Sequence, residues 1–385
     1  MTEEVGAASY RAAGVDYDAL DAAKRLAIAK ALSTSGLLAA RGAHALDASR
    51  GEPAFVFELD GRAFAIVVEG LGTKSIVARQ VLERHGINRF AQVAYDTVAA
   101  ILNDLCCVGA LPLVVNAYFA TGASEWYREP ERAEALLEGW RRACVDGGCA
   151  WGGGESPSLP GLVGELDIEL AGAAVGVVPG GCSPILGEEL GAGDEIVLLA
   201  SSGLHANGAS LARLLQARLP SGYATALPSG VTLGEALLEP TVMYAPLVAS
   251  LLEDGIGVTY ISHVTGHGLL KLMRPPKQLT YRVDRLPDVP EVLSFLVASA
   301  GLDARAAFST FNMGSGYAVY CVAGAGGEVV RIAQGLGYKA LLAGRVEAGP
   351  RQVILEPVDV RFAGAELDLS AADSQPLTEV DGCGG

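Results

Sequence analysis

A short glycine-rich segment in the first half of the chain combines the residue types that bind phosphate. Residues 69–75 read Glu-Gly-Leu-Gly-Thr-Lys-Ser and directly follow a β-prone apolar run. Glycines let a phosphate oxygen approach backbone N–H groups, and a lysine supplies a matching positive charge. The spacing is not that of a Walker A loop, which needs four residues between its first glycine and Gly-Lys. The segment therefore predicts either a phosphate site at Lys74 or a tight turn with a surface lysine.

Acidic side chains occur on a mostly apolar stretch, residues 92–107, which we expect to be a helix. Asp96 and Asn103 are seven residues apart and so share one helix face, and Asp104 follows directly. Burying carboxylates is costly unless they are paired or bind a cation. These residues are candidate metal ligands, although helix capping or a solvated face is the commoner reason for such a pattern.

Three consecutive glycines, Gly152, Gly153 and Gly154, precede Glu155 after an apolar run. Glycines at the end of a strand are entropically costly, so either a ligand approaches the backbone closely or the chain turns sharply there. In the first case Glu155 could bind Mg²⁺ or a ribose hydroxyl. In the second case it would be a solvated carboxylate.

Polar side chains also cluster in the second half of the chain. Residues 201–208 read Ser-Ser-Gly-Leu-His-Ala-Asn-Gly, and such donors before a predicted helix favour an anion. A serine hydrolase is the alternative, but the chain has no Gly-x-Ser-x-Gly segment. His263 and His267 are four residues apart, yet the glycines on both sides of His267 disfavour the helix that a metal-binding pair would need.

Helix-like and strand-like segments position these residues. Two β-prone runs, 54–59 and 63–68, flank Asp60-Gly61 and predict a hairpin. Residues 33–51 are expected to form a loop, and residues 266–273 the start of a helix. Hydrophobic periodicity predicts further helices at 17–32, 92–107, 131–145, 207–215, 242–252, 291–300 and 326–336, and strands at 113–119, 168–178, 195–200, 258–261, 316–322 and 338–346. Because hairpin signals accompany mixed strands and helices, the predicted fold class is α+β.

Length and composition limit the class of protein. A chain of 385 residues suggests two large domains, and the break at 179–181 (Pro-Gly-Gly) predicts domains at 1–178 and 179–369, with a flexible tail at 370–385. The net charge of −16 argues against nucleic acid and anionic membranes as partners.

The cysteines and the apolar segments predict a reduced, cytoplasmic protein. The seven cysteines show no zinc-ligand spacing, and no signal peptide is visible. The uncharged stretch 105–124 is broken by Gly-Ala-Leu-Pro, so we expect a buried helix end and a strand rather than a membrane span.

The order of the motifs is more specific than any one of them. From about residue 10 to about 345 it resembles that of the phosphoribosylformylglycinamidine cyclo-ligase, or aminoimidazole ribonucleotide (AIR) synthetase, family. The matching segments are residues 10–16 (Tyr-Arg-Ala-Ala-Gly-Val-Asp), 70–74 (Gly-Leu-Gly-Thr-Lys), 103–105 (Asn-Asp-Leu), 118–122 (Tyr-Phe-Ala-Thr-Gly), 153–155 (Gly-Gly-Glu), 201–208, 265–268 (Thr-Gly-His-Gly) and 311–314 (Phe-Asn-Met-Gly).

The resemblance implies a two-domain α+β fold and a homodimer whose N-terminal domains pair into a central β-barrel. It also implies ATP and Mg²⁺, and a small ribonucleotide substrate. ATP would activate the formyl-amide oxygen of formylglycinamidine ribonucleotide, and the amidine nitrogen would then close the imidazole ring, releasing ADP and phosphate.

By motif match, the resemblance assigns roles to individual residues. The catalytic residues would be Lys74, His205 and Asn207, and the metal ligands Glu69, Asp96 and Asp104. ATP would be bound by Gly70, Gly72, Thr73, Lys74, Asp104, Gly153, Gly154 and Glu155, and the substrate by Ser201, Ser202, Gly203, Thr265, Gly266 and Gly268.

Some positions depart from the family pattern. Glu69 stands where the family usually has Asp, and a Gly-Gly-Phe-Gly-like loop is missing from the first sixty residues. His267 and Lys271 replace parts of a Thr-Gly-Gly-Gly…Glu-Asn segment. These changes favour an alternative, a divergent relative that uses ATP on another small amide-type substrate. A nucleotide-binding scaffold without catalysis is a third possibility, against which the intact Lys74, Asp104 and Glu155 argue.

Overall fold

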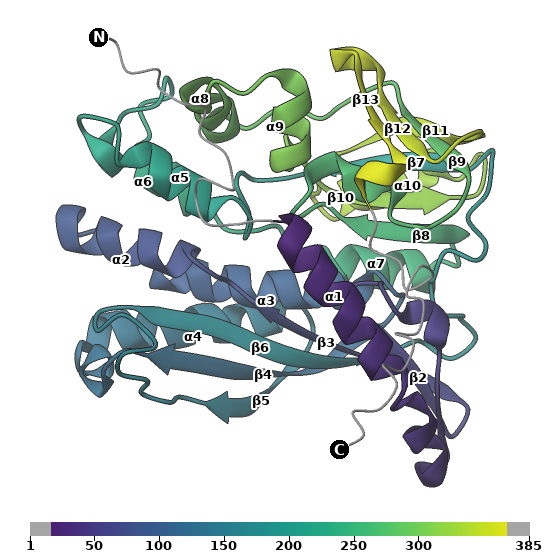
Figure 1. Cartoon of the computed structure of the whole chain (residues 1–385), viewed down its shortest axis with the longest axis horizontal. Helices are drawn as coiled ribbons and strands as arrows, with labels where there is room; N and C mark the ends of the chain where they lie inside the picture. Colours follow the sequence, from purple (N-terminus) through teal and green to yellow (C-terminus); the bar gives the residue numbers. More distant parts are fainter. Residues whose placement is uncertain (1–16, 368–385) are drawn as a thin grey trace, which may run out of the picture.

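The computed structural model describes residues 17–367. The predicted tail, residues 370–385, and the first motif, residues 10–16, lie outside this range. Figure 1 shows one sheet at the bottom, a layer of long helices above it, and a second sheet with its own helices at the top. Helix α1 runs obliquely in front of α3 and β3, with its upper end at the boundary between the two halves.

The first sheet has the strand order β1-β2-β3-β6-β4-β5 and is antiparallel except for its β4–β5 pair. Helices α3 and α4 pack on one face of it. The strands are β1 (Ala43–Ala45), β2 (Phe55–Leu59), β3 (Arg62–Gly70), β4 (Leu111–Thr121), β5 (Ala150–Glu155) and β6 (Ile168–Val177), and the helices are α1 (Tyr17–Leu32), α2 (Lys74–His85), α3 (Phe90–Cys106) and α4 (Pro130–Asp146).

The second sheet has the strand order β13-β12-β9-β11-β7-β10-β8, with β12–β9 as its parallel pair. Its strands are β7 (Glu195–Ala200), β8 (Val258–His263), β9 (Leu279–Val283), β10 (Ser315–Cys321), β11 (Ala340–Ala348), β12 (Gln352–Leu355) and β13 (Val360–Ala363). The helices are α5 (Ala209–Gln216), α6 (Leu233–Leu237), α7 (Ala245–Glu253), α8 (Glu291–Ala300), α9 (Ala304–Thr310) and α10 (Gly326–Gly335). The strands of one sheet thus end at residue 177 and those of the other begin at 195, while the domain limits at 178 and 369 stay predictions.

The mixed α+β character and the hairpin are confirmed. Strands β2 and β3 pair around Asp60 and Gly61, whose φ angles of 51° and 71° are those of the turn that matches strand twist. The uncharged stretch 105–124 is the end of α3 followed by β4. Within residues 17–367, no helix has both the length and the apolar character that crossing a bilayer requires.

Two local predictions are wrong, and one helix was not predicted. Residues 33–51 are not a plain loop, because they contain β1 and two 3-10 turns. Within the expected helix start at 266–273, the structure has a 3-10 turn at Gly268–Met273 instead. His267 directly before this turn has a left-handed backbone, with φ 72°, so a regular α-helix cannot begin there. Helix α2 was not predicted, because its polar first residues, Lys74 and Ser75, do not indicate a buried helix start. In the structure both residues are buried.

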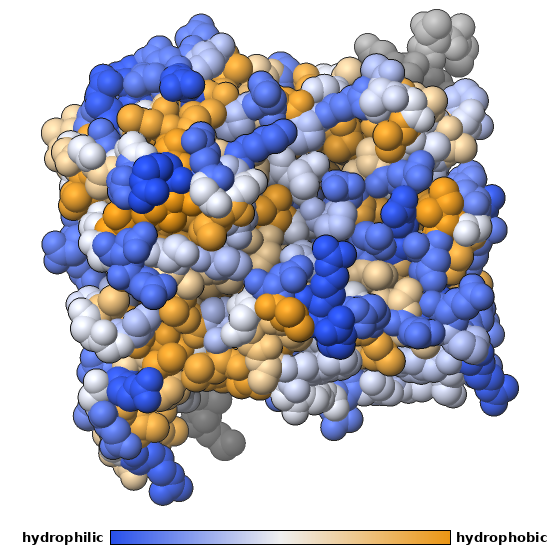
Figure 2. All heavy atoms as spheres, turned by 180° about the vertical axis from the view of Figure 1, so that it is seen from behind, coloured by the Kyte–Doolittle hydropathy of each residue, from blue (hydrophilic) through white to orange (hydrophobic). Residues whose placement is uncertain are grey.

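Apolar side chains remain on the surface of both halves, as Figure 2 shows for the face turned away from Figure 1. On the first sheet, exposed apolar residues alternate with buried ones along a strand. Val68 is 70% exposed and Ile66 39% exposed, whereas Val67 between them is buried. The sheet therefore has a second apolar face that its own helices do not cover.

Candidate active site

The glycine-rich loop connects strand β3 to helix α2 and touches the second half of the chain. Gly72 has φ 68°, a backbone conformation that glycine adopts without steric cost. The Thr73 hydroxyl is hydrogen-bonded to Ser210 Oγ at 2.9 Å, in the first turn of α5. The loop thus lies at the seam between the two halves, next to a helix start.

Lys74 begins helix α2 and is completely buried in that seam. Its Nζ lies 2.6 Å from Asp96 Oδ2, and both side chains are 0% exposed. The same ammonium donates to the backbone oxygens of His205, at 2.9 Å, and Glu239, at 3.4 Å. Asp96 also accepts a 2.6 Å hydrogen bond from the backbone N–H of Thr241. Lys74 therefore joins residues of both halves, and a phosphate could reach its ammonium only by replacing one of these partners.

A second charged group contains Glu69, Asp104 and His263. Asp104 Oδ1 lies 2.6 Å from His263 Nδ1. Burial, then the charge of Asp104 and a hydrogen bond to its carboxylate, together raise the pKa of Glu69 to about 8, against the lowering effect of Lys271. Burial would also raise the pKa of Asp104, but the His263 imidazole brings it below its ordinary value. Of the two carboxyl groups, Glu69 is therefore the protonated one and Asp104 the ionised one.

The donor set of this group suits a magnesium ion. Two adjacent carboxylates repel each other when both are ionised, and a divalent cation removes that repulsion. Mg²⁺ is commonly held by one or two carboxylates together with substrate phosphates. Asp96 is not part of this group, because its carboxylate forms an ion pair with Lys74. In the described part of the chain, no group of three or more His, Cys, Asp or Glu side chains is arranged to bind a metal ion. Glu69 and Asp104 therefore fit a shared ion but not a self-sufficient protein cage.

The segment 201–208 forms a tight turn around a buried histidine. His205 has φ 59°, and its Nε2 accepts a 3.2 Å hydrogen bond from the Ser202 N–H. Burial, followed by the charges of His263 and Lys74, holds the pKa of His205 well below its usual range. The imidazole is therefore neutral and carries its hydrogen on Nδ1, which has no hydrogen-bond partner among residues 17–367. It can act as a neutral donor, not as a cation.

The neighbouring predicted substrate residues are held by contacts with the loop before strand β10. Ser201 Oγ lies 2.8 Å from Asn312 Oδ1, and Asn312 Nδ2 donates to the Gly203 carbonyl at 2.9 Å. In the loop after β8, the Gly268 N–H donates to the Thr265 carbonyl at 3.0 Å. A Cβ on Gly268 would lie 2.2 Å from the Phe308 oxygen, so only glycine fits there. Asn207, Ser202, Thr265 and Gly266 remain partly accessible around this turn.

The predicted segment 153–155 lies at the open edge of the first sheet, on β5. Glu155 is exposed and pairs in register with Tyr118 of β4. A Cβ on Gly154 would come 2.0 Å from the Ala117 oxygen, so the close approach of β4 explains this glycine. A pocket of about 410 Å³ lies between Tyr118, Gly72 and Thr73, and therefore links the glycine-rich loop to this edge.

Sequence reasoning missed a buried ion pair beside Asp104. Glu52 accepts a 2.7 Å hydrogen bond from the Tyr260 hydroxyl and lies 3.6 Å from Arg274 Nε. Burial raises the pKa of Glu52, while Arg274 lowers it. The charge of Arg274 also reaches Asp104 and contributes to lowering its pKa. The only signal in the sequence was the basic spacing of Lys271 and Arg274 directly after the His267 loop.

The fold and the site together define a two-domain α+β protein in which polar groups of both halves converge on one seam. The model of the N-terminal domain of AIR synthase related proteins matches residues 51–178, and that of the C-terminal domain matches residues 191–355. The chain therefore belongs to the AIR synthase related family.

Relatives with assigned names resemble the chain over most of its length. A phosphoribosylformylglycinamidine cyclo-ligase of Carboxydothermus hydrogenoformans is 32% identical, with 90% of this chain and 98% of that protein covered. The Sorangium cellulosum protein of the same name is 37% identical, with 88% and 95% covered. The family resemblance of the motifs is thus confirmed.

Solved structures are similar in fold at lower identity. A chain of the HypE–HypF complex superimposes with a TM-score of 0.57 at 16% identity, covering 82% of this chain and 93% of that one. The structure titled AaThiL complexed with AMPPCP and TMP gives a TM-score of 0.55 at 15% identity, with 81% and 90% covered. These similarities extend to the fold alone.

Proposed function

We propose that this protein is an ATP-dependent cyclo-ligase that converts formylglycinamidine ribonucleotide to aminoimidazole ribonucleotide. The γ-phosphoryl group of ATP is transferred to the formyl-amide oxygen. The amidine nitrogen then attacks the activated carbon, the ring closes, and that oxygen leaves with the phosphate, while ADP is released. Cyclo-ligases at 32% and 37% identity over about nine tenths of the chain support this assignment.

The observation that carries the proposal is the convergence of the motifs from both halves. Lys74 reaches the backbone of His205, Thr73 reaches Ser210, and Asp104 reaches His263. Phosphoryl transfer depends mainly on positioning and on neutralising charge. Residues far apart in the sequence serve that purpose only when the fold brings them to one place, as it does here.

Within this site we assign the nucleotide to the glycine-rich loop and the neighbouring pocket. The N–H groups of Gly70, Gly72 and Thr73 would face the phosphates, with Lys74 behind them. Glu69 and Asp104 would hold Mg²⁺, which supplies charge neutralisation on the phosphate oxygens. Gly153, Gly154 and Glu155 lie on β5, which pairs with β4 beside the pocket that Gly72, Thr73 and Tyr118 line.

On the other side of the seam we assign the ribonucleotide to the segments 201–203 and 265–268. Their backbone groups and hydroxyls supply neutral donors and acceptors for a polar substrate. His205, neutral and with a free Nδ1 hydrogen in the described structure, is placed to donate to an oxygen of the reacting amide. Asn207 would position the same group.

Release of ADP tests this function directly. The protein should release ADP in the presence of formylglycinamidine ribonucleotide and very little without it. Lys74→Ala should lower that rate at least ~10-fold, since removing one charge-stabilising donor typically costs a few kcal/mol in the transition state. The exposed Lys339→Ala is the matched control and should keep wild-type turnover. No substrate-dependent ADP release by soluble wild-type protein would refute the proposal.

A second candidate is a divergent relative that uses ATP on another small amide-type substrate. Two features favour this candidate. Glu69, which stands where the family usually has the shorter Asp, shares a proton with Asp104, and His267 has a left-handed backbone conformation. This candidate requires ATP binding with Mg²⁺ but negligible turnover of formylglycinamidine ribonucleotide. Complementation of a purine auxotroph that lacks the cyclo-ligase would exclude it.

We also propose a homodimer formed through the uncovered face of the first sheet, with the two sheets closing into a barrel. Val68, Ala173 and Asn116 lie in one row across β3, β6 and β4, and Ile66 and Val175 lie in the next. Val68 and Ile66 are exposed. An exposed apolar face on a sheet commonly marks a contact with another protein surface, and C2 pairing of identical faces is the commonest form of such a contact.

A further inference from the structure

The C-terminal end of helix α4 holds two cysteines side by side. The Cys149 N–H donates to the Cys144 carbonyl at 3.0 Å, and the Gly148 N–H donates to the Val145 carbonyl at 3.2 Å. Gly148 has a left-handed backbone with φ 70°. These two hydrogen bonds around a left-handed glycine define a Schellman motif, in which the side chains of the first and last residues often touch. Here those two residues are Cys144 and Cys149.

The two thiol groups differ in their access to solvent and in their acidity. Cys144 is only 4% exposed, whereas Cys149 is partly exposed. A hydrogen bond between the two thiols lowers the pKa of Cys149 and raises the pKa of Cys144. The thiolate is the reactive form of cysteine, so the sulfur that solvent can reach is also the better nucleophile. Cys144 lies behind it as a second thiol.

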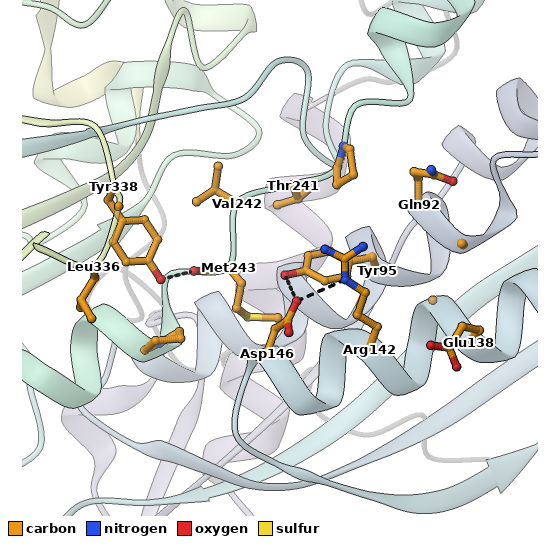
Figure 3. A pocket seen from close by; sticks show the side chains of 15 residues that line it. Gln92, Tyr95, Glu138, Arg142, Asp146, Thr241, Val242, Met243, Leu336 and Tyr338 are labelled. Carbon is orange, nitrogen blue, oxygen red and sulfur yellow. Dashed lines mark hydrogen bonds and ion pairs between the residues drawn. The ribbon is translucent and has the colours of Figure 1, made fainter. Parts of the chain in front are cut away.

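Contacts with helix α3 hold this end of α4 in place. Figure 3 shows the side chains of Arg142 and Asp146, from the last turns of α4, meeting Tyr95 of α3. The Tyr95 hydroxyl donates to Asp146 Oδ2 at 3.1 Å, and Arg142 Nε lies 3.6 Å from the same oxygen. A Cβ on Gly147 would lie 2.3 Å from Leu102 Cδ1, so the chain passes close to α3 directly after the helix. The two cysteines are thus kept together by the packing around them.

A third thiol lies nearby but is too deeply buried to compete. Cys106 of α3 is 0% exposed. Burial raises its pKa well above the ordinary value, and the charges of Cys107 and Cys149 add to this effect. Cys106 therefore stays a protonated thiol. Of these thiols, only Cys149 combines access from solvent with a thiol in hydrogen-bond contact.

We propose that Cys144 and Cys149 form a thiol–disulfide exchange site, which closes to a reversible disulfide when a small disulfide such as oxidised glutathione reaches Cys149. The Cys149 thiolate attacks one sulfur of the small disulfide, a mixed disulfide forms, and the other half leaves as a thiolate. Cys144 then gives its proton to solvent and attacks the Cys149 sulfur, and the second half leaves. The protein loses two protons and two electrons, and the small disulfide is reduced to two thiols.

The second step is favoured because both sulfurs belong to one rigid turn. A reaction between groups held in the right geometry is much faster than the same reaction between free molecules. A disulfide needs Cα atoms within roughly 7 Å of each other, and the direct hydrogen bond between the backbones of Cys144 and Cys149 favours such an approach. The bond would join the end of α4 to the start of β5. It involves the thiols alone, so the proposal is independent of the reaction proposed above.

Peptide mapping of the full chain tests the proposal. The native protein is incubated with millimolar oxidised glutathione, and the remaining thiols are then blocked with iodoacetamide. Trypsin cleaves after Arg142 and an Asp-specific protease cleaves before Asp146, so the two cysteines fall in separate peptides, 143–145 and 146–166. Mass spectrometry should find these two peptides joined, and dithiothreitol should separate them.

Variants test the order of the two steps. In Cys144→Ala the reaction should stop at the mixed disulfide, so glutathione on Cys149 should be at least ~10-fold more abundant than in wild type, where the neighbouring thiol displaces it. In Cys149→Ala, the buried Cys144 should remain a free thiol. Cys182 is the other partly exposed cysteine among residues 17–367, and Cys182→Ala is the matched control that should keep the link. Circular dichroism checks the folding of each reduced variant.

Several results would overturn the proposal, and the first three come from the wild-type protein itself. They are two free thiols at Cys144 and Cys149 after the incubation, glutathione that accumulates on Cys149 without the link, and a link from Cys149 to Cys106 instead. Loss of the link in Cys182→Ala, or modification of Cys144 in Cys149→Ala, would contradict the assigned order of attack.

Discussion

The buried pair of Lys74 and Asp96 should be the most sensitive electrostatic contact of the protein. The two charged atoms are 2.6 Å apart, and neither side chain is exposed. Removing one partner of such a pair destabilises a protein by about 3–5 kcal/mol, because the remaining charge stays in a low dielectric. Asp96→Asn leaves the ammonium with two carbonyl oxygens, so we expect a loss near 3 kcal/mol. Lys74→Met leaves the carboxylate with one backbone N–H and should cost as much or more.

Removing both charges should restore most of the stability. The double variant Lys74→Met, Asp96→Asn has no uncompensated charge and keeps an acceptor for the Thr241 N–H, and uncharged replacements of buried pairs can be neutral or stabilising. Urea unfolding followed by fluorescence and by circular dichroism would measure all three variants. The exposed pair Arg141–Glu138, whose side chains are 59% and 54% exposed, provides the control, and Arg141→Met should leave the unfolding midpoint unchanged.

The outcome can refute the reasoning in two ways. If either single variant unfolds at the wild-type urea concentration, the pair does not lie in a dry interior. If the double variant loses as much stability as the two single variants combined, the two charges do not compensate each other, and their effects are simply additive.

Three further predictions concern the acid pair, the assembly and the departures from the family pattern. Glu69 has a pKa of about 8 in the folded protein, against an ordinary value of 4.5, so between these pH values the folded state binds more protons than the unfolded state. The free energy of unfolding should therefore fall as the pH rises from 5 to 8, by at most about 1.4 kcal/mol per pH unit. Melting curves in EDTA should show this slope in wild type and a flatter one in Glu69→Gln, and equal slopes would contradict it. Val68→Asp should convert the dimer to a monomer, as measured by light scattering at micromolar concentration. Val322 is exposed on the other half of the chain, and Val322→Asp should leave the dimer intact. A monomeric wild-type protein would count against the barrel. His267→Gly combined with Glu69→Asp should keep or raise cyclo-ligase turnover, and a clear loss would favour the divergent relative.

Much of the secondary structure was predictable because it follows local rules. Helix α8, Glu291–Ala300, was predicted with its observed limits, and the β2–β3 hairpin followed from Asp-Gly between two β-prone runs. Helix α2 was not predicted. Its start is polar, and only the second half of the chain, packed against it, provides the acceptors that let Lys74 be buried.

The candidate site was predictable as a set of residues but not as an arrangement. Lys74, Asp96 and Asp104 were identified, yet the sequence placed Asp96 and Asp104 together as metal ligands. In the structure Asp96 faces Lys74, and Asp104 faces His263 and Glu69. Partners on different elements depend on how those elements pack, and one sequence does not contain that information.

The sequence by itself determined the family, the α+β character and the order of the motifs, because these depend on residue identity and on local spacing. The tertiary structure decided which charges are buried and which partners they have. Lys74 illustrates the reason. A lysine beside glycines is a surface cation by composition, and it becomes a buried contact between the two halves only because Asp96, His205 and Glu239, from distant parts of the chain, surround its ammonium. Burial and pairing are properties of the packed seam, so no local pattern could predict them.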